Sequence, residues 1–246
     1  MAATGLTTLL LGATGATGKH LLKEVVSSEH FSKVSEWGRS VTAPAKLPEA
    51  GKEKLEQKTI DFDNLDVPTF KQGNWDVIFI TLGTTRAKAG SAEAFERIDR
   101  EYVLNAARAA KSDDPTRKQR LVYVSSGGSN PTSMFLYPKS KGLTEQALAT
   151  LGYDDLIIFH PGLLMDSERP ERRIMENIAE PIIGFLGRFS NKLGIPVETV
   201  ARSIRIAGEL GSEKIPADMK STGSWGGPSF TTIDNAQALK LAKFQA

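Results

Sequence analysis

The chain of 246 residues contains no cysteine and only three histidines. The absence of cysteine excludes disulfide bonds, thiol nucleophiles and thiolate metal sites. The histidines, His20, His30 and His160, are far apart and lack the spacing of metal ligands. We therefore expect no metal site and interpret these residues as ordinary surface or core histidines.

A strong net charge and a long apolar run are also missing. The net charge of +2 gives no electrostatic case for a nucleic-acid partner. No apolar run approaches the ~20 residues of a membrane-spanning helix. The first strand is expected from about Thr7, which leaves no room for a cleaved leader, and Pro131 blocks the one Asn-x-Thr glycosylation pattern at Asn130. These absences predict a protein that is not secreted and is soluble or at most attached to a membrane surface.

Short apolar runs alternate with helical patterns along most of the chain. This alternation predicts an α/β fold of the Rossmann type, with a doubly wound parallel sheet and helices on both faces. The hydrophobic content of 40% is sufficient for one domain over residues 1–246. We expect further strands at Phe31–Trp37, Lys58–Phe62, Trp75–Thr81, Leu121–Val124 and Leu156–Phe159. We expect helices at Leu21–Val26, Ala92–Lys111, Ile195–Leu210 and Ile233–Lys243, with a loop over Ser212–Pro228.

Three glycines, Gly12, Gly15 and Gly18, lie at three-residue intervals between the first strand and the first helix. In a dinucleotide-binding turn the first glycine permits the tight turn and the second lets the backbone approach the pyrophosphate. The third lets helix and strand pack closely. The N-terminus of the following helix then faces the anion. This order predicts a dinucleotide site near the start of the chain.

The second predicted strand ends at Gly38 and Arg39, where NAD-binding proteins often carry an acidic residue for the ribose 2′-hydroxyl. No carboxylate stands here to repel a 2′-phosphate, and an arginine can bind that phosphate bidentately. The alternative is a solvated arginine at a strand end. We predict NADPH rather than NADH as the cofactor.

Three more strand ends fall where a ligand crevice is expected. Asp61 could meet the adenine, or it could begin an Asx turn. The small-residue turn at Leu82 and Gly83 would lie beside the cofactor ribose. The serine turn at Ser125 and Ser126 would present a hydroxyl to the substrate.

Tyr137 and Lys141 are four residues apart at the start of a predicted helix, so they lie on one face. An ammonium beside a phenol favours the phenolate and lowers the pKa of the tyrosine from its usual ~10. Such a tyrosine can exchange a proton with a carbonyl oxygen as a hydride is transferred. A serine hydroxyl can hold the same oxygen; Ser126 is our first choice and Ser125 the second.

The segments GATGATG, WGR, LGTTR, VSSGG and YPKSK together resemble the short-chain dehydrogenase/reductase superfamily. The further pieces LGTTRAKAG, RIDREYVLNAA, FLYPKSKG and HPGLLMD are similar to an atypical branch of it. This branch comprises the Tat-interacting-protein oxidoreductase and its fungal mitochondrial-proteome homologues. The resemblance covers about residues 7–210.

The resemblance implies that NADPH is held by the glycine turn, by Arg39 and by four later positions, with Tyr137 as proton donor and Lys141 as its partner. The turn residues are Thr14, Gly15, Ala16 and Thr17, and the later positions are Leu82, Gly83, Leu164 and Arg169. Two departures from the branch pattern stand out: Ser40 replaces a second basic residue, and Pro138 replaces the usual filler after the tyrosine.

The segment Asp166–Gly194 is where this fold class usually builds its substrate region, and we expect residues 166–230 to contribute the substrate or lid region. Several arginines surround the apolar stretch 181–186. Three interpretations fit this mixture: a substrate lid, a patch for a membrane surface or a protein partner, and a helix packed on the domain.

The sequence therefore predicts an NADPH-dependent oxidoreductase that reduces a small carbonyl substrate, as a monomer or homodimer. An NADPH-sensing scaffold with little turnover is the alternative, and a sugar-nucleotide epimerase is a third interpretation. The fungal resemblance suggests the cytoplasmic face of the mitochondrial outer membrane.

Overall fold

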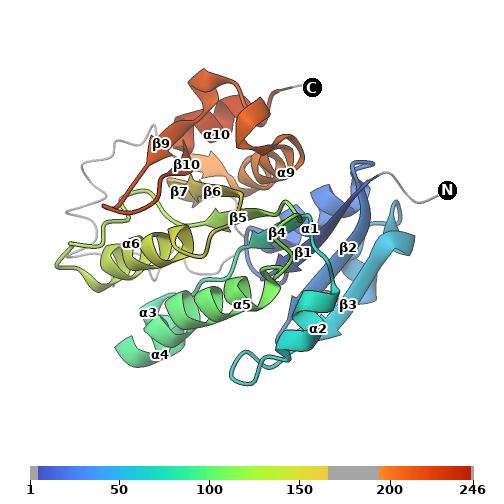
Figure 1. Cartoon of the computed structure of the whole chain (residues 1–246), viewed down its shortest axis with the longest axis horizontal. Helices are drawn as coiled ribbons and strands as arrows, with labels where there is room; N and C mark the ends of the chain where they lie inside the picture. The colour runs from blue at the N-terminus through green and yellow to red at the C-terminus, as the bar shows by residue number, and fades with distance from the viewer. Residues whose placement is uncertain (1–4, 166–193, 245–246) are drawn as a thin grey trace.

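The computed structural model describes residues 5–165 and 194–244. Within them the backbone forms one eight-stranded sheet with the strand order β3-β2-β1-β4-β5-β6-β10-β9 (Figure 1). Every neighbouring pair is parallel except β10 and β9 at one edge. In chain order the strands are β1 Leu6–Leu11, β2 Phe31–Gly38, β3 Leu55–Thr59, β4 Val77–Ile80, β5 Arg120–Val124, β6 Asp155–His160, β9 Ser221–Gly223 and β10 Phe230–Asp234.

Helices cover both faces of this sheet (Figure 1). One face carries α1 Gly18–Ser27, α9 Val197–Lys214 and α10 Asn235–Leu241, and the other carries α2 Val67–Gln72, α5 Tyr102–Ala110 and α6 Leu136–Ala149. The short helices α3 Arg86–Ala89 and α4 Ala92–Glu96 precede α5. Single 3₁₀ turns lie at Pro44–Lys46, Lys52–Lys54 and Ala217–Met219, and the small strands β7 Leu163–Met165 and β8 Gly194–Pro196 pair with each other.

Strand β1 lies between β2 and β4, and its second half is buried on both faces, which explains the apolar run Leu9–Leu11. Leu10 packs into the core beneath α1 and α9, whereas Leu9 and Leu11 pack into the core beneath α5 and α6. Successive side chains of a strand point to opposite faces, so one run of leucines supplies both cores. The predicted doubly wound Rossmann fold is confirmed.

The sequence prediction was wrong at two element boundaries. Strand β3 covers Leu55–Thr59, earlier than the predicted 58–62, because it pairs in register with β2 from Val34. The predicted C-terminal loop and helix contain the strands β9 and β10. Residues 230–234 extend alongside β6, and α10 begins only after Asp234, whose side chain forms a capping box with Gln237.

A further difference concerns the predicted helix at 92–111. It consists of α4, a π-helical turn at Arg97–Glu101, and α5. Such a turn inserts one residue into the helical repeat and so changes which side chains face inward. Asp99, in this turn, is completely buried.

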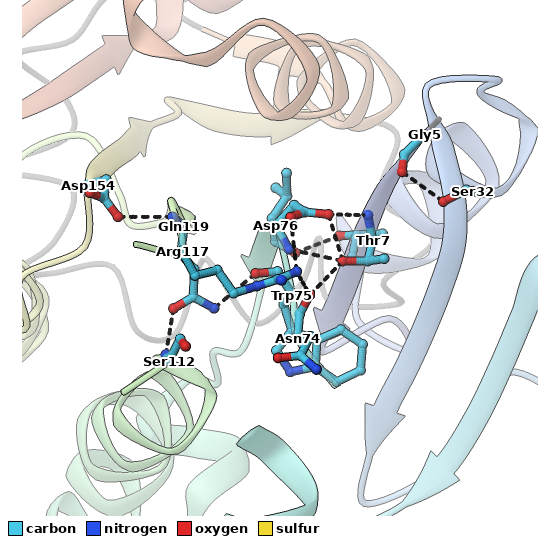
Figure 2. A network of polar contacts seen from close by, with 12 residues as sticks. Gly5, Thr7, Ser32, Asn74, Trp75, Asp76, Ser112, Arg117, Gln119 and Asp154 are labelled. Atoms are coloured by element: carbon cyan, nitrogen blue, oxygen red, sulfur yellow. Dashed lines mark hydrogen bonds and ion pairs between the residues drawn. The ribbon is translucent and has the colours of Figure 1, made fainter. Parts of the chain in front are cut away.

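The amino-terminal edge of the sheet is closed by a polar network (Figure 2). The carboxylate of Asp76 accepts hydrogen bonds from the backbone and hydroxyl of Thr7, both at 2.8 Å, and pairs with Arg117 at 3.1 Å. The side chain of Gln119 donates to the carbonyl of Trp75 at 2.9 Å. These contacts tie the starts of β1, β4 and β5 together and have a structural role.

Candidate functional site

The glycine turn follows β1 at the carboxyl edge of the sheet. Gly12 has a φ of +92°, and a Cβ there would lie 2.8 Å from the carbonyl carbon of Thr81. A Cβ on Gly18 would overlap the carbonyl oxygen of Gly12, which also accepts a hydrogen bond of 3.0 Å from Gly15. The turn therefore closes only without side chains at its first and third glycines.

The middle of the turn is open, as a phosphate-binding loop requires. Thr14 and Gly15 are exposed, Ala16 is half-buried, and Thr17 is buried at the start of α1. The first turn of α1 contains no acidic residue, and the Thr17 side chain makes no capping hydrogen bond. A helix N-terminus without a competing carboxylate is suited to a bound anion. The chain's own geometry thus fits the pyrophosphate of a dinucleotide.

The loop after β2 presents Arg39 and Ser40 to solvent. It is held from below by Glu36, a buried carboxylate of β2. One oxygen of Glu36 accepts from the backbone and hydroxyl of Thr42 at 2.7 and 2.8 Å, and the other accepts from the amide of Gln57 at 2.7 Å. This carboxylate shapes the loop from inside the protein and does not face the expected 2′-phosphate.

Asp61 forms the Asx turn that the sequence left as one of two interpretations. Its carboxylate accepts from the backbone of Asp63 at 2.9 Å and from the side chain of Asn64 at 2.8 Å, and these bonds lower its pKa. A contact with adenine stays a prediction. Next to it, Phe62 stacks on Tyr102 with ring centroids 5.2 Å apart.

Asp63 fastens this turn to the helices below it. It accepts a hydrogen bond of 2.8 Å from Tyr102 and pairs with Arg97 at 2.6 Å. Burial and the bond to Asp63 raise the pKa of Tyr102, and the cations Arg97 and Arg39 partly oppose that rise. Arg39 therefore lies within electrostatic reach of the same corner of the crevice.

The turn after β4 brings Leu82, half-buried, and Gly83, exposed, to the same edge. A Cβ on Gly83 would lie 3.3 Å from an oxygen of Asp99 and 3.6 Å from Nζ of Lys141. The backbone N–H of Thr84 donates to Oδ1 of Asp99 at 3.0 Å. The predicted cofactor turn and the predicted catalytic lysine are thus neighbours, with Asp99 between them.

Helix α6 carries Tyr137 in its first turn and Lys141 in its second. The Tyr137 ring is half-buried, 5.9 Å from the ring of Phe95. Nζ of Lys141 pairs with Oδ2 of Asp99 at 2.9 Å and donates to the hydroxyl of Tyr123 at 3.1 Å. Both members of the ion pair are buried, with side chains 4% and 0% exposed.

The environment of Lys141 keeps it charged. Burial by itself lowers the pKa of an amine, but the carboxylate of Asp99, with Tyr123 and Tyr137 nearby, raises the pKa of Lys141 well above its usual value. Burial raises the pKa of Tyr123, so this phenol stays neutral. Tyr137 and Lys141 lie one turn apart on α6, and the closest charge to Lys141 is the carboxylate of Asp99, which the sequence prediction did not include.

The two serines after β5 have different environments. Ser125 is buried and donates its hydroxyl to Oε1 of Glu145. The hydroxyl oxygen of Ser126 is also buried, but it has no hydrogen-bond partner in the part of the chain that the structure describes. A buried hydroxyl without a partner is costly unless a ligand completes it. Ser125 is therefore committed to Glu145, and the role of Ser126 toward a substrate stays a prediction.

Glu145 lies one turn after Lys141 on α6 and is completely buried. Nε2 of His160 lies 3.0 Å from Oε1 of Glu145, and the indole N–H of Trp225 donates to Oε2 at 3.0 Å. Burial would raise the pKa of Glu145, but the hydrogen bonds from His160 and Ser125 lower it below its usual value. This group anchors the serine turn to α6, β6 and the loop between β9 and β10.

Sequence reasoning missed Asp99, Glu145 and Tyr123. The available signal was a charged residue at an apolar position, since Asp99 falls between Phe95 and Val103 on the face assigned to the core.

Two predicted cofactor contacts lie further along the chain, after β6. Leu164 is half-buried in β7, and Arg169 lies outside the described residues, as does the 166–193 part of the predicted substrate region.

Among residues 5–165 and 194–244, no three potential metal-ligating side chains come together. No helix in these ranges is long and apolar enough to cross a bilayer.

No family model matches the chain. It is similar to curated relatives over most of its length. Protein HTATIP2 of Rattus norvegicus is 39% identical over 198 residues, which is 79% of this chain and 78% of that protein. The mitochondrial protein FMP52-2 of Scheffersomyces stipitis is 34% identical over 237 residues, 95% and 96% of the two chains. The mitochondrial protein FMP52 of Candida albicans is 32% identical over 181 residues, 72% and 75% of the chains.

Solved structures share the fold at low sequence identity. The enzyme WbmH of Bordetella bronchiseptica, in complex with NAD+, has a TM-score of 0.58 at 16% identity, covering 83% of this chain and 72% of that one. UDP-glucuronic acid 4-epimerase of Bacillus cereus, in complex with NAD, has a TM-score of 0.57 at 14% identity, covering 83% and 73%. These likenesses concern the Rossmann fold. The extended similarity to the curated relatives shows that the chain belongs to the family of HTATIP2 and the fungal FMP52 proteins.

Proposed function

We propose that this protein is an NADPH-dependent oxidoreductase of the short-chain dehydrogenase/reductase type that reduces a carbonyl group. The observation that supports this most is the buried, charged Lys141 on the same helix face as Tyr137, next to the turn at Gly83. A site that only bound a dinucleotide would not need a cation buried beside a phenol. The fold of the NAD-bound neighbours is consistent with a nicotinamide cofactor.

The residues around the crevice suit NADPH. The turn from Gly12 to Gly18 and the N-terminus of α1 would hold the pyrophosphate, and Arg39 would bind the 2′-phosphate. The turn at Leu82 and Gly83 would border the ribose. When bound, NADPH supplies the hydride.

The chain's own residues would handle the proton and the orientation of the substrate. Tyr137 would give its phenolic proton to the carbonyl oxygen as that oxygen gains negative charge. Lys141 would stabilise the resulting phenolate. Ser126 would donate a hydrogen bond to the same oxygen, because Ser125 is already bonded to Glu145.

The first prediction is that Tyr137→Phe abolishes turnover and leaves NADPH binding intact. Loss of a general acid costs about 10²–10⁴-fold in rate. Fluorescence titration with NADPH, followed by turnover assays on a panel of aldehydes and quinones, measures both quantities. Tyr153→Phe is the matched control, because the Tyr153 hydroxyl donates to the carbonyl of Ala107 at 2.6 Å, away from the crevice.

Unchanged turnover in Tyr137→Phe would refute the assignment of the proton donor. Binding of NADPH with no turnover of any carbonyl by the unaltered protein would instead favour a cofactor-sensing role.

We also propose that the protein works at the cytoplasmic face of the mitochondrial outer membrane, as a peripheral protein. The support is the mitochondrial designation of the fungal relatives. Protease treatment of intact isolated mitochondria tests it, since a tagged protein at this face is digested and one inside the organelle is protected.

A further inference from the structure

Lys141 is surrounded by groups from four elements. Asp99 comes from the π-helical turn, Tyr123 from β5, Tyr137 from the same helix α6, and Gly83 from the turn after β4. Glu145, one turn along α6, is the next carboxylate, but its oxygens are occupied by Ser125, His160 and Trp225.

Asp99 is the one carboxylate within ion-pair distance of Lys141 in the described part of the chain. Burial raises the pKa of Tyr123, so this neutral phenol can accept a hydrogen bond from Lys141 but cannot balance its charge. An ammonium in a dry site without a counter-ion gives up its proton, and buried lysines can then titrate near neutral pH. The charge of Lys141 therefore depends on Asp99.

One oxygen of Asp99 makes a backbone hydrogen bond and the other forms the ion pair. Oδ2 faces Lys141 at 2.9 Å, and Oδ1 accepts the backbone N–H of Thr84 at 3.0 Å. The π-helical turn directs the Asp99 side chain inward. There it is buried between the apolar side chains of Phe95 and Val103. One carboxylate thus connects the turn after β4 to the second turn of α6.

We propose that Asp99 is a positioning residue that keeps Lys141 protonated, one helical turn from Tyr137, throughout the working pH range. This inference depends on the proposed function, in which Lys141 stabilises the phenolate of Tyr137. Asp99 need not touch the substrate or the cofactor; it acts through the lysine.

The test compares Asp99→Asn with the unaltered protein. Asparagine keeps the shape and the acceptor for Thr84 but removes the charge, so Lys141 is expected to lose its proton within the neutral to mildly alkaline range. We expect the alkaline limb of the turnover profile to move by about one pH unit or more toward lower pH.

The matched control is Asp155→Asn. Asp155 pairs with Arg120 at 2.7 Å and accepts a backbone N–H from Ser212 at 3.0 Å, so it repeats the chemistry of Asp99 at the opposite edge of the sheet. Its removal is expected to leave the pH profile of turnover unchanged.

A second readout does not need turnover. The ¹³Cε NMR signal of Lys141, assigned by its disappearance in Lys141→Arg, reports the protonation of this lysine directly. We expect no titration below strongly alkaline pH in the unaltered protein and a titration near neutral pH in Asp99→Asn. A lysine that stays charged in the variant would overturn the inference, whether or not a substrate is known. Absence of turnover in the unaltered protein would count against the proposed function alone.

The variant could also fail to fold, because it leaves a buried cation unpaired. The double variant Asp99→Asn/Lys141→Gln then decides, since it contains neither charge. Recovery of folding by the double variant supports the dependence of Lys141 on Asp99. Failure of both variants shows a packing role for Asp99 and contradicts the proposal.

Discussion

Two buried carboxylates support the crevice, and each has its own partners. Asp99 faces Lys141 and the turn after β4, whereas Glu145 faces His160, Trp225 and the serine turn. Lys141 and Glu145 are one helical turn apart on α6 and carry opposite charges, but each is bonded to its own set of partners. Lys141 and the serine turn are thus held by separate contacts, and variants of the two carboxylates should have distinguishable effects.

At the scale of single residues, Arg39 is expected to decide the choice of cofactor. We predict that Arg39→Ala weakens NADPH binding by about 10- to 100-fold, because a bidentate contact with phosphate contributes a few kcal/mol. Binding of NADH should change little. Fluorescence titration with both nucleotides measures the two affinities.

Arg108→Ala is a suitable control, since Arg108 contacts Asn105 on the outer side of α5. Equal affinity of the unaltered protein for NADH and NADPH would contradict the role assigned to Arg39.

At the scale of elements, the join between β1 and α1 depends on the absence of a side chain. We predict that Gly18→Ala lowers NADPH affinity by about tenfold or more and reduces the free energy of unfolding by about 1–3 kcal/mol. The added Cβ overlaps the Gly12 carbonyl oxygen and pushes the helix N-terminus away from the strand. Calorimetric titration and urea denaturation measure the two effects.

Gly227→Ala provides the comparison, because a Cβ there meets nothing within 4 Å. If both variants bound NADPH like the unaltered protein, the glycine turn would not be the pyrophosphate site.

The π-helical turn is the second element with a functional consequence. The apolar spacing of Phe95, Val103 and Ala106 predicts a regular helix, and most of that prediction is confirmed. The spacing does not show the inserted residue, because a π-helical turn forms when the whole helix adjusts to its neighbours. Asp99 becomes part of the site through this adjustment.

At the scale of the whole molecule, Glu145 joins segments far apart in the chain, through Ser125, His160 and Trp225. We predict that Glu145→Gln reduces the free energy of unfolding by about 2–3 kcal/mol at neutral pH, since it weakens several buried polar contacts. Urea denaturation monitored by circular dichroism measures it.

This loss should depend on pH in a defined direction. The pKa of Glu145 is lowered from the usual 4.5 in the folded protein. Its contribution to stability is therefore fully present above pH 4.5 and is lost as the pH falls through the lowered value. The difference between Glu145→Gln and the unaltered protein should shrink in that acid range. A difference that stays constant down to strongly acid pH would show that the ionised form of Glu145 is not what stabilises the fold.

Features that depend on near neighbours in the chain were predictable from the sequence. The glycine turn, the alternation of strands and helices, and the shared face of Tyr137 and Lys141 follow from spacing over a few residues. The C-terminal strand β10 was not predictable in this way. Residues 230–234 are extended because β6 offers them a parallel edge, and no local pattern reports that edge.

The sequence by itself determined the Rossmann architecture and the order in which the predicted site residues reach one edge of the sheet. The tertiary structure decided which partner each of them has. Lys141 meets Asp99 and Ser125 meets Glu145, while the Ser126 hydroxyl has no partner among residues 5–165 and 194–244. These pairings join residues far apart in the chain inside a low-dielectric core, where burial makes the choice of partner decisive for charge. Spacing along the chain carries no record of that choice.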